Sequence, residues 1–290
     1  MRLATQDLHE LAGVAISAAT DAGRLIGESR PATVTHKTDG TSLASQVVTE
    51  IDRRSEGIII EHLAPTLVRF ELGLLTEEST DEGSRLERDY FWCVDPLDGT
   101  LPFIEDTPGS AVSIALVASD GTPVIGVMFD LTSSSVWHAV AGGGAYRDGY
   151  PWTGSPEPSD VLSVFADRSF ATAGYHDAMV EGLQSIANDR GLNAIRLHMG
   201  AGAVMNALGV VQAPPACYLK LPSSAGGGSL WDFAATACWF TQAGAVATDI
   251  HGAPLDLNRS DSAFMHHRGV LFATDQRLAS ELRGFCSSLI

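Results

Sequence analysis

The feature that most constrains this chain is the segment at residues 91 to 103, FWCVDPLDGTLPF, where an apolar run ends on an aspartate. Such a run predicts a buried strand that delivers Asp95 to the rim of a sheet. Pro96 biases Asp95 away from the helical region, and the turn that follows returns Asp98 toward the same space. Because two packed carboxylates would repel each other, we expect a positive group between them.

The next two residues add a place for an anion beside this cation site. Gly99 allows the backbone to approach a ligand closely. If a helical turn begins at Thr100, its N–H groups point into the same space. Carboxylates suit Mg²⁺ and amides suit phosphate oxygens, so the segment is consistent with a site for a metal-bound phosphate. Taken alone, Asp98-Gly99 is more typical of an ordinary turn.

Three further acidic positions fit the same picture. Glu77 in TEES follows an apolar run, Asp52 lies where we expect a helix to start near Thr49, and Asp232 begins a helix after a glycine-rich connector. Each of them alone is more typical of a helix cap or a solvated surface residue. Together they supply about the number of carboxylates that two divalent ions roughly 3.5–4 Å apart require.

The charge of the chain narrows the classes of function. The 290 residues include 35 acidic and 18 basic side chains, for a formal charge of −17. A protein that coats nucleic acid needs a basic face, so we expect no nucleic-acid partner. A small anionic substrate is compatible with this charge where metal ions reverse the local field.

Localisation is inferred from the apolar pattern and the cysteines. Residues 4–29 predict an amphipathic helix rather than a signal peptide, and no apolar run is long enough for a membrane span, so we expect no membrane partner. The cysteines form no CxxC pair and predict buried free thiols in a reducing, cytoplasmic compartment; they are Cys93, Cys217, Cys238 and Cys286.

Strand-like and helix-like segments alternate along the chain, which predicts a layered α/β or α+β fold. A Pro- and Ser-rich stretch at 151–160 marks a boundary between an N-terminal subdomain, 1–150, and a C-terminal subdomain, 151–290. We expect a polar loop at 31–45 and helices at 4–29, from Thr49 to Pro65, and at 176–190, 202–212 and 231–243. The expected strands are near 68–76, at 90–94, 111–118, 123–130, within 134–149, and at 162–167, 193–199, 216–221 and, as the last one, 245–250.

TEES (76–79), DPLDGT (95–100) and WDFAAT with QAG (231–244) resemble the motifs of the inositol monophosphatase superfamily. Its members are Mg²⁺-dependent, often lithium-sensitive phosphomonoesterases. The resemblance runs from about residue 10 to residue 275, with weaker support at 47–52, 111–117, 123–130 and 142–149. It implies an αβαβα sandwich of the inositol monophosphatase and fructose-1,6-bisphosphatase type, a homodimer, and a site between the two subdomains.

The resemblance also implies a ligand set. The N-terminal subdomain carries most of the metal ligands: Glu77, Asp95 and the carbonyl of Leu97 would bind one Mg²⁺. Asp95, Asp98 and Asp232 would bind a second ion, with Mn²⁺ as a substitute and Li⁺ as an inhibitor there.

The same resemblance implies the catalytic roles. Thr100 and Glu77 would orient the attacking water, and Asp52 would assist and bind a third, weaker ion. Asp98 and the amides of Gly99 and Thr100 would contact the phosphorylated substrate.

The chain departs from the family pattern near the substrate. Leu101-Pro102 replaces a polar pair, which makes the mouth of the site more apolar, and the loop from Lys37 to Asp52 is longer than in inositol-type members. Lys220 stands where inositol-selective members have a glutamate, and an ammonium there favours a substrate with a second anionic group. Inositol or sugar monophosphates and 3′-phosphoadenosine 5′-phosphate-like bisphosphates therefore both stay open. The alternative to an enzyme is a non-catalytic protein that binds or senses a phosphometabolite.

Overall fold

The structure is a computed structural model that describes residues 3–29, 43–154, 159–223 and 227–289, with only the backbone of residues 43–49. Lys37 and most of the expected polar loop at 31–45 lie outside the described residues. Among the described residues, no helix has the combination of length and apolar character that crossing a bilayer requires.

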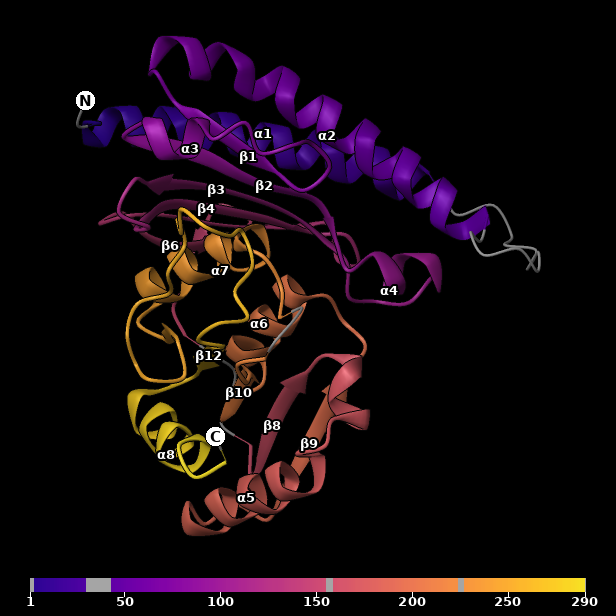
Figure 1. The fold of residues 1–290 in the computed structure, drawn as a ribbon, viewed down its shortest axis with the longest axis vertical. Coiled ribbons are helices and arrows are strands. Elements are labelled where there is room, and N and C mark those ends of the chain that lie inside the picture. Colours follow the sequence, from indigo (N-terminus) through magenta and orange to yellow (C-terminus); the bar gives the residue numbers. More distant parts are fainter. Residues whose placement is uncertain (1–2, 30–42, 155–158, 224–226, 290) are drawn as a thin grey trace.

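Helices and sheets alternate in five layers (Figure 1). The first layer is the pair α1 (Thr5–Glu28) and α2 (Leu43–Arg69), which covers one face of a seven-stranded sheet. Helices α6 (Ala203–Gln212) and α7 (Leu230–Ala243) lie between that sheet and a five-stranded sheet. Helices α5 (His176–Asp189) and α8 (Gln276–Cys286) cover the outer face. The fold is therefore the expected αβαβα sandwich.

The first sheet follows the order of the chain. Its strands pair antiparallel except for the first two, which are parallel. The expected hairpin around Asp120-Gly121 is confirmed, since Gly121 adopts a φ of 85° in the turn. The strands are β1 (Gly73–Thr76), β2 (Tyr90–Asp98), β3 (Ala111–Ala118), β4 (Pro123–Asp130), β5 (Ser135–Val140), β6 (Gly144–Arg147) and β7 (Tyr150–Pro151).

The second sheet has the order β11-β12-β10-β8-β9, with β12 antiparallel to both of its neighbours. Its strands are β8 (Val161–Ala166), β9 (Ala194–Met199), β10 (Ala216–Lys220), β11 (Val246–Thr248) and β12 (Val270–Ala273). Short helices α3 (Ser84–Glu87) and α4 (Thr100–Ile104) and a 3-10 helix (Arg168–Thr172) connect the layers. All four cysteines are buried and free, as expected.

Helix α2 corrects two expectations. It begins at Leu43 rather than near Thr49, and it continues through Pro65 to Arg69. A proline inside a helix removes one backbone hydrogen bond. Tertiary contacts hold the last turn nevertheless, because Thr66 is buried there and its hydroxyl accepts a hydrogen bond from the Trp92 indole at 2.9 Å. Asp52 consequently lies inside a helix and not at its start.

The C-terminal end of the chain holds two elements that the sequence analysis missed. The strand at 245–250 is not the last one, because β12 and the amphipathic helix α8 follow it. Strand β12 has only four residues, so its pattern alone is too short to distinguish a strand from an apolar loop. Its pairing between β10 and β11 makes it a strand.

Candidate active site

The end of strand β2 aims two aspartates at one space. In a regular strand, residues three apart face opposite sides of the sheet. Here the register with β3 shifts between Asp95 and Asp98. The chain advances three residues on β2 but only two on β3, from Ser113 to Ala111. This irregularity changes the alternation and brings both side chains to the same side. Oδ1 of Asp95 also accepts a hydrogen bond from the Leu97 N–H at 3.0 Å, which fixes the turn.

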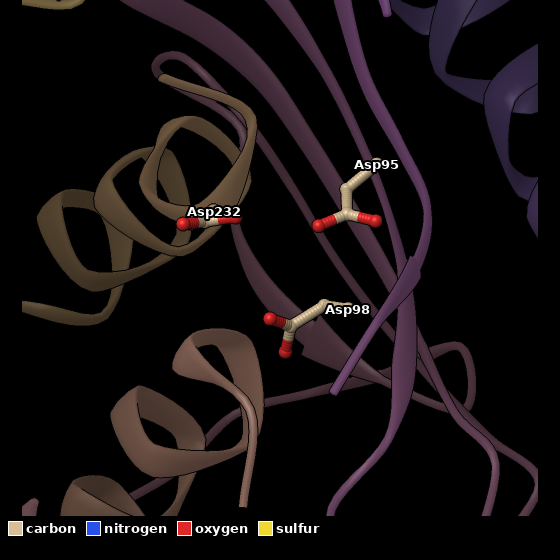
Figure 2. Close-up of side chains that lie close together, drawn as sticks. All are labelled: Asp95, Asp98 and Asp232. Atoms are coloured by element: carbon tan, nitrogen blue, oxygen red, sulfur yellow. The ribbon is translucent and has the colours of Figure 1, made fainter. Parts of the chain in front are cut away.

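Helix α7 brings Asp232 to the two aspartates of β2. Ser113, the cross-strand partner of Asp95 on β3, donates its hydroxyl to the carbonyl of Trp231 at 3.1 Å and so holds the start of the helix. Asp232 Oδ2 accepts a hydrogen bond from the Ser229 N–H at 2.8 Å. Oxygens of Asp95, Asp98 and Asp232 lie within 4.8 Å of one another, and Figure 2 shows the three carboxylates around a common space.

Glu77 comes to this cluster from the neighbouring strand end. Strand β1 pairs parallel to β2, and the Glu77 N–H donates to the Val94 carbonyl at 3.2 Å. Glu77 is exposed at the rim as a whole residue, but its carboxyl group lies inward, where it is hydrogen-bonded with that of Asp95. The turn is held from α2 by Glu56, whose buried carboxylate accepts the hydroxyl of Ser79 at 3.0 Å and also that of Thr76. Glu56 was not predicted from the sequence, because an acidic residue in a helix carries no signal of its partner.

Enclosure and mutual repulsion raise the pKa values of the cluster. Burial, and then the neighbouring carboxylates, raises the pKa of Asp95 and of Asp98 well above the ordinary range. Burial first, and then the charges of nearby acidic groups, raises the pKa of Glu77 and that of Asp52 to about 7. A bound cation would reverse these shifts, because it stabilises the ionised carboxylates. The donors are all oxygens, so the residues fit a hard divalent cation such as Mg²⁺.

Asp98 also joins the two sheets through helix α6. Its carboxylate accepts the N–H groups of Ala203 at 3.0 Å and Val204 at 2.9 Å, which are at the start of that helix. The approach requires a glycine before the helix, since a Cβ on Gly202 would lie 2.3 Å from Oδ2 of Asp98. Gly202, Ala203 and Val204 were not predicted from the sequence as site residues. The only signal was the Gly-Ala-Gly run at 200–202 ahead of a predicted helix.

Of the other expected site residues, Thr100 and Gly99 lie directly after Asp98. Gly99 has a φ of 78° and precedes helix α4, which begins at Thr100. The carbonyl of Leu97 accepts the Thr100 hydroxyl at 3.4 Å. Asp52 is buried on α2, where the charges of Glu78 and Glu77 act on it.

A cleft of about 360 Å³ opens beside the aspartates. Leu101, which is 56% exposed, makes its mouth apolar. Lys220 reaches the cleft as expected, but its ammonium pairs with Asp167 at 2.5 Å, a partner that the sequence analysis missed. The lining comprises Asp98–Pro102, Asp167–Ser169, Gly200–Ala203, Lys220 and Asp232.

Comparisons with known proteins show to which family the chain belongs. The model of the inositol monophosphatase family matches residues 7–283. Inositol monophosphatase 2 of Solanum lycopersicum is 30% identical over 255 residues, which cover 86% of this chain and 91% of that protein. Nus factor SuhB of Escherichia coli (strain K12) is 28% identical over 260 residues, covering 84% of this chain and 87% of that protein.

A solved structure shows the same fold. Inositol monophosphatase II from Staphylococcus aureus MSSA476 superposes with a TM-score of 0.73 at 20% sequence identity, covering 94% of each chain. Because the family match extends over nearly the whole sequence, the chain belongs to the inositol monophosphatase family.

Proposed function

We propose that this phosphatase is a Mg²⁺-dependent phosphomonoesterase that hydrolyses a small phosphorylated metabolite by direct attack of water. The observation that carries the proposal is the convergence of Asp95, Asp98 and Asp232 beside an open cleft. Three buried or half-buried carboxylates with raised pKa values would destabilise the folded chain at neutral pH unless cations accompany them. A group that binds hard cations beside a cleft suits a phosphate ester.

The metal ligands are proposed as two overlapping sets. Glu77, Asp95 and the Leu97 carbonyl would hold one Mg²⁺, and Asp95, Asp98 and Asp232 the other. Asp52 would support a third, weaker ion, and Mn²⁺ would substitute for Mg²⁺. Two such ions make a water molecule easier to deprotonate and neutralise the charge that develops on the leaving oxygen.

The protein groups then have positioning roles. Glu77 and the Thr100 hydroxyl orient the attacking water, with Asp52 behind them. The amides of Gly99 and Thr100 receive the phosphate, and Asp98 contacts the substrate as well as the metal. The apolar mouth at Leu101 excludes water from one side of the phosphate.

The substrate is proposed as an inositol or sugar monophosphate or a 3′-phosphoadenosine 5′-phosphate-like bisphosphate. Solved structures of SaIMPase-II, which share the fold at TM-scores of 0.68 and 0.70, hold inositol monophosphate in one case and 2′AMP in the other. For Lys220 to bind the second anionic group of a substrate, that group must displace Asp167 from the ammonium. Lys220→Glu should therefore reduce kcat/KM for a bisphosphate more than for a monophosphate.

A second candidate function is binding or sensing of a phosphometabolite without catalysis. The name of one relative, Nus factor SuhB, describes a factor rather than an enzyme and supports this candidate. A chain used only for binding has no need to keep Glu77 and Thr100 together with the three aspartates.

One assay separates the two candidates. Phosphate release is measured over a panel of inositol, sugar and nucleoside phosphates in Mg²⁺, in Mn²⁺ and after treatment with EDTA. We expect release in Mg²⁺, loss of release in EDTA, and recovery when Mg²⁺ is restored. Undiminished release in metal-free buffer would exclude the proposed mechanism, and no release from any ester would favour the binding protein. In the same assay, millimolar Li⁺ should inhibit at low Mg²⁺, because Li⁺ is close to Mg²⁺ in size but carries half the charge.

A further inference from the structure

A second pocket of about 240 Å³ adjoins the catalytic cleft on the side of the C-terminal sheet. The two share Asp167, Ser169 and Lys220 in their linings, so they meet at these residues. Lys220 also lies close enough to Asp232 for its charge to act on that carboxylate. The second pocket therefore adjoins the place proposed for the phosphate.

The boundary between the two spaces is a fixed polar pair. The carboxylate of Asp167 binds the ammonium of Lys220 at 2.5 Å, the hydroxyl of Tyr218 at 2.9 Å and the amide of Asn206 at 3.4 Å. Tyr218 and Asn206 are fully buried, so they hold the carboxylate in place. A carboxylate has about four lone-pair sites, and these three donors leave room for one more. The ammonium likewise keeps donors for a ligand.

Beyond this pair the lining combines aromatic and apolar side chains with Ser169, Ser223 and Gly227. The rings of Phe170 and Tyr175 lie 6.3 Å apart at 45° to each other. Leu219, Leu221 and two alanines complete the apolar part of the lining. Tyr175 is 37% exposed, so its ring is open to a ligand.

This lining distinguishes between two kinds of leaving group. A polyol carries hydroxyl groups around its whole edge, and those that face an apolar wall lose their hydrogen bonds to water without replacement. A planar heterocycle has apolar faces that stack on aromatic rings and a polar edge that needs only a few partners. The pocket offers aromatic faces for a ring, and the Lys220–Asp167 pair together with Ser169 as polar partners for its edge, which matches the heterocycle.

We propose that the second pocket is a leaving-group site that binds a planar nitrogen heterocycle, so that the preferred substrates are nucleoside-type phosphomonoesters. The ring packs against Tyr175 and Phe170, and its polar edge meets Lys220 as donor and Asp167 as acceptor. The inference rests on the proposed phosphatase function for the position of the phosphate. The selectivity of the pocket is a separate property, which binding alone can measure.

The test compares 2′-AMP with inositol 1-phosphate, two monophosphates of secondary alcohols that carry the same phosphate charge. Equilibrium binding of each is measured by calorimetry with the full chain in Ca²⁺ in place of Mg²⁺, so that the ester is not consumed during the titration, for wild type and for Tyr175→Ala. Tyr150→Ala is the matched control, because Tyr150 is 77% exposed on β7 and lines neither space. Phe170→Leu is a second, independent change in the aromatic lining of the same pocket.

The wild type should bind 2′-AMP more tightly than inositol 1-phosphate. Tyr175→Ala should weaken binding of 2′-AMP about tenfold, within the range for loss of one base–aromatic stack, and leave inositol 1-phosphate within about twofold. Phe170→Leu should shift the ratio in the same direction, and Tyr150→Ala should not shift it. A wild type without the preference, or equal losses on both ligands in Tyr175→Ala and Phe170→Leu, would overturn the proposal. Failure of the wild type to release phosphate from either compound would contradict the phosphatase mechanism, and the binding ratio would still decide the pocket.

Discussion

Asp98 and Asp232 each belong to the carboxylate cluster and to the start of a helix. Asp98 accepts two N–H groups of α6, and Asp232 accepts one at the start of α7. Asparagine carries no charge for a cation and has one acceptor oxygen, which suffices for the single bond at 232 but for only one of the two at 98, where the two N–H groups bond to different oxygens. Asp98→Asn and Asp232→Asn should therefore each lower kcat by about a hundredfold or more, while stability in EDTA stays within about 1 kcal/mol for Asp232→Asn and falls by about 1–3 kcal/mol for Asp98→Asn.

Steady-state kinetics in Mg²⁺ and thermal unfolding in EDTA measure the two effects. Asp177→Asn is the control, because its side chain is 99% exposed on α5. The ligand assignment is wrong if either site variant turns over its best substrate at the rate of the control.

The close approach of α6 to the end of β2 depends on one glycine. A Cβ on Gly202 would lie 2.3 Å from Asp98 Oδ2 and 2.6 Å from the Gly99 nitrogen, and the latter is backbone that cannot swing away. Gly202→Ala should displace the start of α6 or the carboxylate, and lower kcat/KM at least about tenfold, because ångström-scale errors in position are costly to catalysis. It should also lower the melting temperature.

Gly57→Ala is the matched control for this substitution. Gly57 is exposed in the interior of α2, and a Cβ there meets nothing within 4 Å. Alanine should stabilise that helix by about 0.5–1 kcal/mol and leave kcat/KM unchanged. Equal kinetics for the two variants would show that α6 does not position Asp98.

For the whole molecule, the acidic site links stability to pH and to metal. Asp52 and Glu77 have pKa values of about 7 in the cation-free fold, above their ordinary values of 3.8 and 4.5. The folded state thus binds protons more tightly than the unfolded state. The stability that these two groups contribute to the fold is fully present at a pH below their ordinary pKa values. It is lost as the pH rises through their folded-state pKa values of about 7. Mg²⁺ replaces the protons, so the increase in melting temperature on adding Mg²⁺ should be larger at pH 8 than at pH 5.5.

Thermal melts in Mg²⁺ and in EDTA at the two pH values test this linkage. Asp52→Asn removes one of the titrating groups and should flatten the pH dependence in EDTA. The same Mg²⁺ effect at both pH values would contradict it.

The sequence alone determined the features that depend on neighbouring residues. The apolar run before Asp95, the turn at Asp120-Gly121 and the amphipathic pattern of α1 predicted their elements, because period and turn chemistry are local. The motifs around Asp98 and Asp232 also carried the family resemblance, and with it the layered fold, which the structure shares.

Only the tertiary structure decided which side chains meet. The register shift in β2 turns Asp98 to the side of Asp95, and Ser113 holds the start of α7 against them. The partner of Lys220, the continuation of α2 through Pro65 and the strand β12 likewise depend on contacts between segments distant in the sequence. Periodicity places a residue on a face of its own element. The packing of that element against others determines what the residue touches, and for this reason the carboxylates were expected from the sequence while Asp167, Gly202 and the aromatic pocket were not.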